Sequence, residues 1–140
     1  MKALQNTQVI LGSVAQAAAT TPRTALFDAL NASSAKILVA TGANTNATEN
    51  VTISVSTGDN ATSTTDYVSA GSIASLPAAT TGVVRVVDLD MRGKGRYVYV
   101  AATPGTNGTT AQVAVGSIVG VFETGIRPDN SDTQVGNAVL

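Results

Sequence analysis

The stretch Val51-Thr52-Ile53-Ser54-Val55-Ser56 alternates strictly between apolar and polar side chains. Successive side chains of a β-strand point to opposite faces of its sheet, so this alternation predicts a strand with one buried and one solvated face. Residues 111–121 also alternate, with mostly bulky side chains at odd positions and mostly small ones at even positions. Both stretches predict β-structure.

Other stretches rich in β-branched and aromatic residues extend this prediction along the chain. Three of them are apolar on both faces and are predicted as central strands: residues 36–40, 83–87 and 96–100. Two weaker strands are expected at residues 8–14 and 64–73. Turn-forming residues separate the strands at 41–44, 57–60, 93–95 and 104–108. Short strands with such breaks predict an all-β fold, an antiparallel β-sandwich that is jelly-roll-like.

One short helix is expected outside this pattern, at residues 24–30. Thr24 has the side chain of a helix N-cap, and Asn31 is a residue that ends helices.

The 140 residues correspond to a single domain with two extended arms. We expect an N-terminal arm or first strand at 1–21, the β-sandwich at 22–123 and an extended C-terminal arm at 124–140. The 17 residues of the C-terminal arm show no periodicity and could span ~56–61 Å at full extension, more than the width of such a domain. The arm is predicted to lie on a partner, and the alternative is that it folds back on its own domain. Its candidate partner-binding residues are Ile126, Arg127, Pro128, Val135, Val139 and Leu140.

The composition argues against several classes of function. The chain has no His, Cys or Trp, so it lacks a disulfide framework, a thiolate nucleophile and the commonest general base and metal ligand. Its net charge of −1 is unlike the basic balance of a nucleic-acid-binding protein. No apolar run reaches the length of a membrane span. Residues 1–20 resemble an export leader only superficially, because polar residues 5–8 interrupt the apolar stretch. We expect no cofactor, no metal, no nucleic-acid partner and no membrane partner.

Two motifs have a possible chemical role and a simpler structural interpretation. Asp88 and Asp90 share one face of a predicted strand, and paired carboxylates can bind Ca²⁺ or act as acid and base. The simpler interpretation is a solvated strand end beside Arg92. Residues 93–96 could cradle a phosphate, but they lack the strand–loop–helix context of a P-loop. A hairpin turn with exposed cations is the favoured interpretation.

Acidic and aromatic residues outside these motifs also have two interpretations. Glu49, Asp59 and Asp66 lie in polar loops that could bind Ca²⁺, yet their spacing is not that of an EF-hand. Tyr97 and Tyr99 are two residues apart and could stack a sugar or a base, although on so apolar a strand at least one is expected in the core. No general base is predicted beside any Ser or Thr, so we expect no enzymatic activity.

The order of the strand-rich segments resembles a known family. Gly95-Arg96-Tyr97-Val98-Tyr99-Val100 is followed, after a turn, by Ala111-Gln112-Val113-Ala114-Val115, and it is preceded by a strand ending in a Thr57-Gly58-Asp59 loop. This order is similar to that of the head decoration, or cement, proteins of tailed bacteriophages, small β-sandwich proteins attached outside the capsid shell. The resemblance covers residues 30 to 123. The tail after Phe122 and the polar residues 44–50 depart from it.

The resemblance implies a structural virion protein on the capsid exterior. Such a protein decorates and stabilises a tailed-phage capsid by bridging subunits of the major capsid protein, and we expect it to be a homotrimer or homodimer. The family has no catalytic residues to carry over. Two alternatives remain: another virion component of the tail, neck or fibre, and a carbohydrate-binding β-sandwich module.

Overall fold

The computed structural model describes residues 7–13, 21–44, 50–75, 82–107, 110–111 and 113–124. These residues form strands and turns without a helix. The strands are β1 (Thr7–Ser13), β2 (Arg23–Asp28), β3 (Ala32–Asn44), β4 (Val51–Gly58), β5 (Val68–Ser75), β6 (Val83–Asp90), β7 (Tyr97–Pro104), β8 (Thr106–Asn107), β9 (Thr110–Ala111) and β10 (Val113–Thr124).

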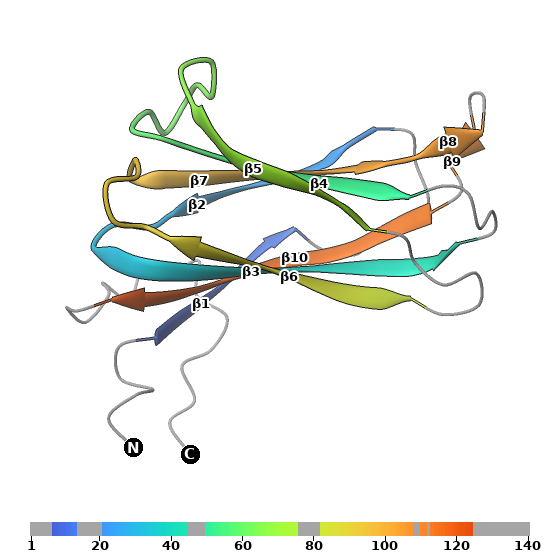
Figure 1. Cartoon of the computed structure of the whole chain (residues 1–140), viewed down its shortest axis with the longest axis horizontal. Coiled ribbons are helices and arrows are strands. Elements are labelled where there is room, and N and C mark those ends of the chain that lie inside the picture. The colour runs from blue at the N-terminus through green and yellow to red at the C-terminus, as the bar shows by residue number, and fades with distance from the viewer. Residues whose placement is uncertain are drawn as a thin grey trace.

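Two four-stranded antiparallel sheets face each other as the layers of a sandwich (Figure 1). Sheet A has the strand order β1-β10-β3-β6, and sheet B has the order β2-β7-β4-β5. The strands β8 and β9 form a separate two-stranded hairpin between β7 and β10. Without that hairpin, the chain crosses between the sheets in the order of an eight-stranded jelly roll. The predicted all-β, jelly-roll-like sandwich is confirmed.

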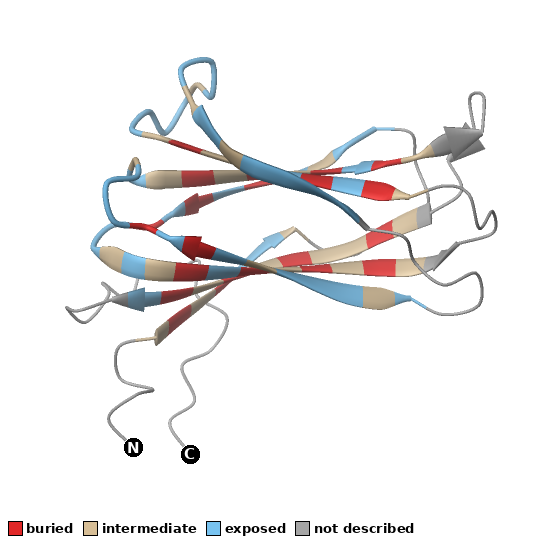
Figure 2. Ribbon diagram, viewed as in Figure 1, coloured by how far each residue is buried: buried red, intermediate tan, exposed pale blue. Residues whose placement is uncertain are grey.

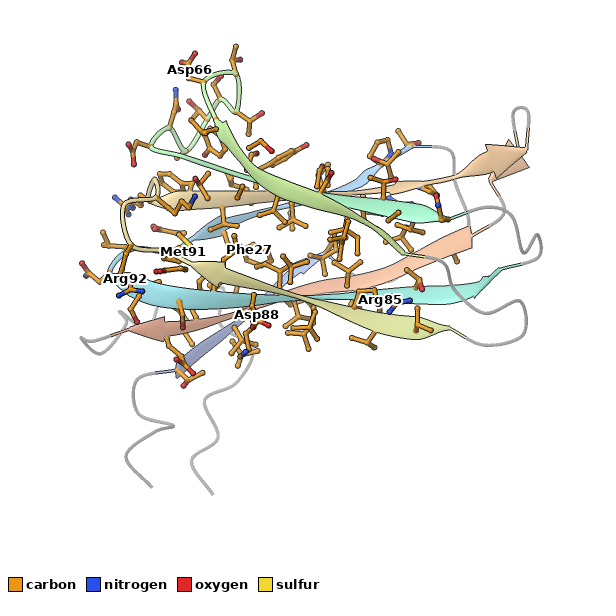
Figure 3. The ribbon with its side chains drawn as sticks, viewed as in Figure 1. Phe27, Asp66, Arg85, Asp88, Met91 and Arg92 are labelled. Carbon is orange, nitrogen blue, oxygen red and sulfur yellow. The ribbon has the colours of Figure 1, made fainter. Side chains whose placement is uncertain are left out.

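The core lies between the inner faces of the two sheets, where alternate residues of β2, β3, β4 and β7 are buried (Figure 2). Strand β4 follows the predicted alternation from Val51 to Thr57. The rings of Phe27 from sheet B and Phe122 from sheet A meet with their centroids 5.6 Å apart (Figure 3 labels Phe27). Gly120 leaves room for these rings, since a Cβ there would lie 2.5 Å from Phe122 Cε2. The aromatic pair therefore joins the two layers.

The helix predicted at residues 24–30 is wrong, because this segment is the strand β2. Ala25 and Phe27 are buried while Thr24 and Leu26 are exposed, which is a period of two rather than of 3.6. So short a helix is marginal by itself, whereas β2 gains a ladder of backbone hydrogen bonds with β7. Strand β2 ends at Asp28 rather than at the predicted stop, and Asn31 lies in the turn that follows, where its φ of 63° is in the left-handed region.

The loop predicted at residues 41–44 is also wrong, because β3 continues to Asn44. Strand β10 supplies partners along this extension, pairing Val115 with Thr41 and Val113 with Asn44. Thr41 is buried, and its hydroxyl donates a hydrogen bond of 3.3 Å to the backbone carbonyl of Val83. The predicted loop at 104–108 likewise contains the short strand β8.

Of the three strands predicted to be central, β3 and β7 are central but β6 lies at the edge of sheet A. Most of β6 is exposed, including Val84 and Val86 (Figure 2). Arg85 occupies a position that pairs with the buried Val39 and is nevertheless exposed. A charged residue on the inward register of an edge strand is a common way to discourage unwanted strand pairing.

Candidate interaction surface

The outer face of sheet A carries a row of aliphatic side chains that crosses all four strands. Leu11 of β1 pairs with Val119 of β10, Val119 pairs with Leu38 of β3, and Leu38 pairs with Val86 of β6. Leu38 and Val119 each lie between two buried residues of their strand, so their side chains point away from the core. Leu11 and Val86 are paired with them across the sheet and therefore point to the same side. Leu11 and Val86 are exposed, and Val119 and Leu38 are half-buried.

The neighbouring positions extend this row on both sides. They are Val9 and Val121, which pair with each other, and Ala40 and Val84, which also pair with each other. We call the eight residues the sheet A patch: Val9, Leu11, Leu38, Ala40, Val84, Val86, Val119 and Val121. An aliphatic patch continuous across a whole sheet face is typical of a surface that another protein covers.

A bulge in β10 turns two of the eight patch residues outward. The register with β3 shifts between Val115 and Ile118, so an odd position is buried before the shift and even positions are buried after it. Val115, Ile118 and Phe122 therefore face the core, while Val119 and Val121 face outward. An inserted residue changes the face of every following side chain. In the sequence, Ser117 and Ile118 interrupt the alternation of bulky odd and small even positions at this point.

One end of the sheet A outer face is charged. Lys36 forms an ion pair with Asp88 on the neighbouring strand, and Asp90 forms one with Arg92, at 2.7 Å from Nη2 to Oδ2. Asp88 and Asp90 share a face, as the sequence predicts, but each has its own cation. These exposed ion pairs support the simpler interpretation, a solvated strand end. Within the described residues, no cluster of three acidic side chains that could hold a metal ion is found.

The ion pairs change the pKa values of their members. Hydrogen bonds from the Arg92 side chain and backbone lower the pKa of Asp90 from 3.8 to about 2. The hydrogen bond from Arg96 lowers the pKa of Asp28, and the hydrogen bond to Asp88 raises the pKa of Lys36. All these groups lie at the surface, where solvent and salt weaken such interactions.

A pH dependence of stability follows from Asp90. A carboxylate whose pKa is lower in the folded chain stabilises the fold above its unfolded pKa, and this contribution is lost as the pH falls through the folded value. We expect the free energy of unfolding to decrease between pH 3.8 and about pH 2, and to decrease less in Asp90→Asn. Urea unfolding at a series of pH values measures this. Arg92→Gln removes the ion pair but keeps the Asp90 carboxylate, and it should reduce this pH dependence in the same direction. An Asp90→Asn profile identical to that of the wild type would refute the assignment.

The outer face of sheet B has a different character. Tyr97 and Tyr99 both point outward from β7, since Val98 and Val100 are fully buried. The expectation that at least one of the two tyrosines is in the core is wrong. The rest of this face carries mainly Ser, Thr and Ala: Thr24, Thr52, Ser54, Ser56, Ser69, Ser72, Ala74, Ala101 and Thr103.

The third tyrosine of the chain lies beside Tyr97. The ring of Tyr67 covers Gly58, where a Cβ would come within 2.2 Å of Tyr67 Cδ1, and Gly58 pairs with Tyr97 across the strands. Burial raises the pKa of Tyr67, with smaller contributions from Tyr97 and Asp59. The tyrosines therefore gather at one end of sheet B.

The predicted motif at residues 93–96 joins the two sheets. It connects β6 of sheet A to β7 of sheet B, so it is a turn but not a hairpin. Arg96 is held by Asp28, with hydrogen bonds of 2.9 Å from Nε and 2.6 Å from Nη2, and its guanidinium lies 5.1 Å from the centroid of the Tyr97 ring. The backbone amide of Arg96 donates to Asp59 Oδ1 at 2.8 Å. The motif fastens the 59–67 loop to β2 and β7.

The remaining predicted residues are placed as follows. Glu49 lies outside the described residues. So do the six candidate partner-binding residues, which are Ile126, Arg127, Pro128, Val135, Val139 and Leu140. Part of the expected N-terminal arm, Thr7–Ser13, is strand β1 of sheet A. Thr7 pairs with Glu123, so the start of β1 and the end of β10 lie at the same end of this sheet. The described part of the chain has no helix that is long and apolar enough to cross a membrane.

Comparisons with known proteins concern the fold. No family model matches the sequence, and no curated protein matches it significantly. The tobacco streak virus coat protein dimer is 12% identical with a TM-score of 0.42, over 91% of this chain and 92% of that chain. The top component of cowpea mosaic virus is 11% identical with a TM-score of 0.44, over 93% and 92%. Dimeric latent PorU from Porphyromonas gingivalis is 9% identical with a TM-score of 0.50, over 90% of this chain but 13% of that chain. At such identities the likeness is one of fold alone.

Proposed function

We propose that this protein is a structural virion protein that decorates and stabilises the outside of a tailed-phage capsid by bridging subunits of the major capsid protein. The observation that carries this proposal is the sheet A patch, an aliphatic surface on a rigid two-layer scaffold. Jelly rolls recur in viral capsid domains, and the segment order of this chain resembles that of head decoration proteins. The patch is the surface that faces the capsid.

The size of this face argues that further contacts are needed. The four strands overlap over about eight residues and there cover ~500 Å² at the usual strand spacing and rise, whereas a stable interface buries ~800 Å² on each partner. The terminal segments are the natural source of the remaining area. Residues 1–6 and 125–140 continue from Thr7 and Thr124, at one end of the same sheet. The aliphatic residues 126, 135, 139 and 140 would then add to the contact that the patch begins.

Bridging explains how such a protein would stabilise a shell. A contact that spans two capsid subunits exists only in the closed shell, so binding shifts the equilibrium toward that shell. The second contact of a bridging molecule forms at a high effective concentration, which raises the overall affinity without a new type of interaction. A dimer or trimer of the chain would multiply the contacts further. No bond-making step is required.

Copy number per particle tests the proposal. Purified protein is mixed with phage heads assembled without it, and bound copies are counted by quantitative sedimentation and cryo-electron microscopy. We expect occupancy at every equivalent site of the shell, and capsids that withstand heating better than bare ones. A handful of copies at one vertex would favour the alternative of a tail, neck or fibre component. Absence of binding would refute a virion attachment through this chain.

Deletion of residues 125–140 tests the contribution of the C-terminal segment. Strand β10 ends at Thr124, so the sandwich should fold as before, with unchanged circular dichroism. We expect the truncated protein to bind heads at least about tenfold more weakly, a loss of ~1.4 kcal/mol. The double variant Val139→Ser, Leu140→Ser keeps the length of the chain and should weaken binding in the same direction. If the truncated protein coats heads normally, the arm is not a binding element.

A further inference from the structure

A second surface, away from the sheet A patch, has the features of a ligand site. An open cleft of about 800 Å³ lies between the 59–67 loop and the turn at 91–96. Its lining includes Asp59, Asn60, Asp66, Val68, Lys94 and Tyr97. Figure 3 shows Asp66 on the loop that leads into β5, on the far side of the sandwich from sheet A. The volume is within the range of small-molecule sites.

The walls of this cleft are fixed by contacts within the protein. The Tyr67 hydroxyl donates to the backbone carbonyl of Asn60 at 2.6 Å, and Asn60 Oδ1 accepts a hydrogen bond of 2.9 Å from the amide of Thr62. The amide of Arg96 reaches across to Asp59. Gly95 lies so close to Gly58 that a Cβ on it would be 2.5 Å from Gly58 Cα. The two loops are therefore held together before any ligand arrives, which lowers the entropic cost of binding.

The side chains that line the cleft combine apolar and charged groups. Val68 is 70% exposed, and it lines the cleft together with Tyr97, whose ring is oriented by the guanidinium of Arg96. Among the described contacts, the side chains of Asp66 and Lys94 have no hydrogen-bond or ion-pair partner. A carboxylate accepts hydrogen bonds and an ammonium donates them. An apolar surface with unpaired acceptors and donors beside it suits a ligand that has both C–H faces and hydroxyl groups.

The charge of the cleft restricts the ligand further. The cleft has two carboxylates, Asp59 and Asp66, and one ammonium, Lys94, so it repels phosphate groups. Nucleic acid is therefore a disfavoured ligand. The same repulsion disfavours sugars that carry carboxylates or sulfates. We propose that the cleft binds a neutral carbohydrate, whose hydroxyl groups pair with Asp59, Asp66 and Lys94 and whose C–H faces pack on Tyr97 and Val68. This site is independent of the proposed capsid contact, because it uses neither sheet A nor the terminal segments.

A matched pair of variants tests this proposal. The fluorescently labelled full-length protein is applied to an array of defined neutral and acidic glycans, and the best neutral oligosaccharide is then titrated by NMR at up to millimolar concentration. We expect shifts of the amides at 59–68 and 93–97. Tyr97→Ala should weaken binding at least tenfold, whereas Tyr99→Ala, on the same strand and face but outside the cleft, should bind like the wild type. Asp66→Ala, an exposed loop variant that should fold normally, should also bind at least tenfold more weakly.

Several results would overturn the carbohydrate site. One is the absence of binding to any neutral glycan at millimolar concentration. Others are preferential binding of acidic glycans or of single-stranded DNA, and an equal loss of binding in Tyr97→Ala and Tyr99→Ala. Head occupancy of the Asp66→Ala variant separates this proposal from the previous one: it should equal that of the wild type, since the cleft does not take part in capsid attachment.

Discussion

Phe27→Ala is expected to lower the free energy of unfolding by about 3–5 kcal/mol, the usual cost of removing a fully buried phenyl ring. Phe27 is 1% exposed and packs against Phe122 from the opposite sheet. The substitution removes one of the two largest fully buried side chains and leaves a cavity between the layers. Urea unfolding, followed by far-UV circular dichroism, measures the change.

The neighbouring residue is the matched control. Leu26 is on the same strand but faces outward and is 41% exposed, so Leu26→Ala should cost less than about 1 kcal/mol. A double-mutant cycle with Phe122→Ala should give a coupling of about 0.5–1.5 kcal/mol for the ring pair. If Leu26→Ala were the more damaging of the two, the assignment of inner and outer faces of β2 would be wrong.

Val86→Lys should weaken binding to phage heads about 30-fold or more, corresponding to ~2 kcal/mol. Val86 is at the β6 end of the aliphatic row and is 49% exposed. A lysine there is well solvated in the free protein and loses its water when the patch is covered, so the variant affects binding more than folding. Head occupancy at a series of protein concentrations measures the affinity, and thermal unfolding checks the fold.

The control for Val86→Lys lies on the opposite face. Thr52 is exposed on the outer face of sheet B, and Thr52→Lys adds the same charge to the protein without touching the sheet A patch. It should bind heads like the wild type. Attachment through sheet B would be indicated if Thr52→Lys bound weakly and Val86→Lys normally, and the proposed orientation on the capsid would then be reversed.

The two proposals together give the sandwich two faces with separate roles. The aliphatic outer face of sheet A is suited to a protein partner, and the cleft at the tyrosine end of sheet B is suited to a small polar ligand. Their side chains come from different sheets, and the variants proposed for one do not lie in the other. Each proposal can therefore fail without the other.

The class of the fold and the position of most strands follow from local patterns in the amino-acid sequence. Alternation within a strand, as at residues 51–56, records which side chains share a face, and that depends only on local geometry. The same local reasoning failed for β2. The segment around Phe27 contains residues that both helices and strands accept, and its hydrogen bonds to β7 decided between them.

Which faces are covered and which residues meet depend on how the strands pair. Val83 to Val87 is apolar on both faces, and this pattern fits a central strand as well as an edge strand with an aliphatic outer surface. The strand lies at the edge because β3 is its one neighbour in sheet A. The bulge in β10 turned Val119 and Val121 outward. Asp66 and Tyr97 reach one cleft because the chain crosses between the sheets twice between them. Strand pairing joins residues far apart in the chain, and the periodicity of a single segment carries no information about its partners.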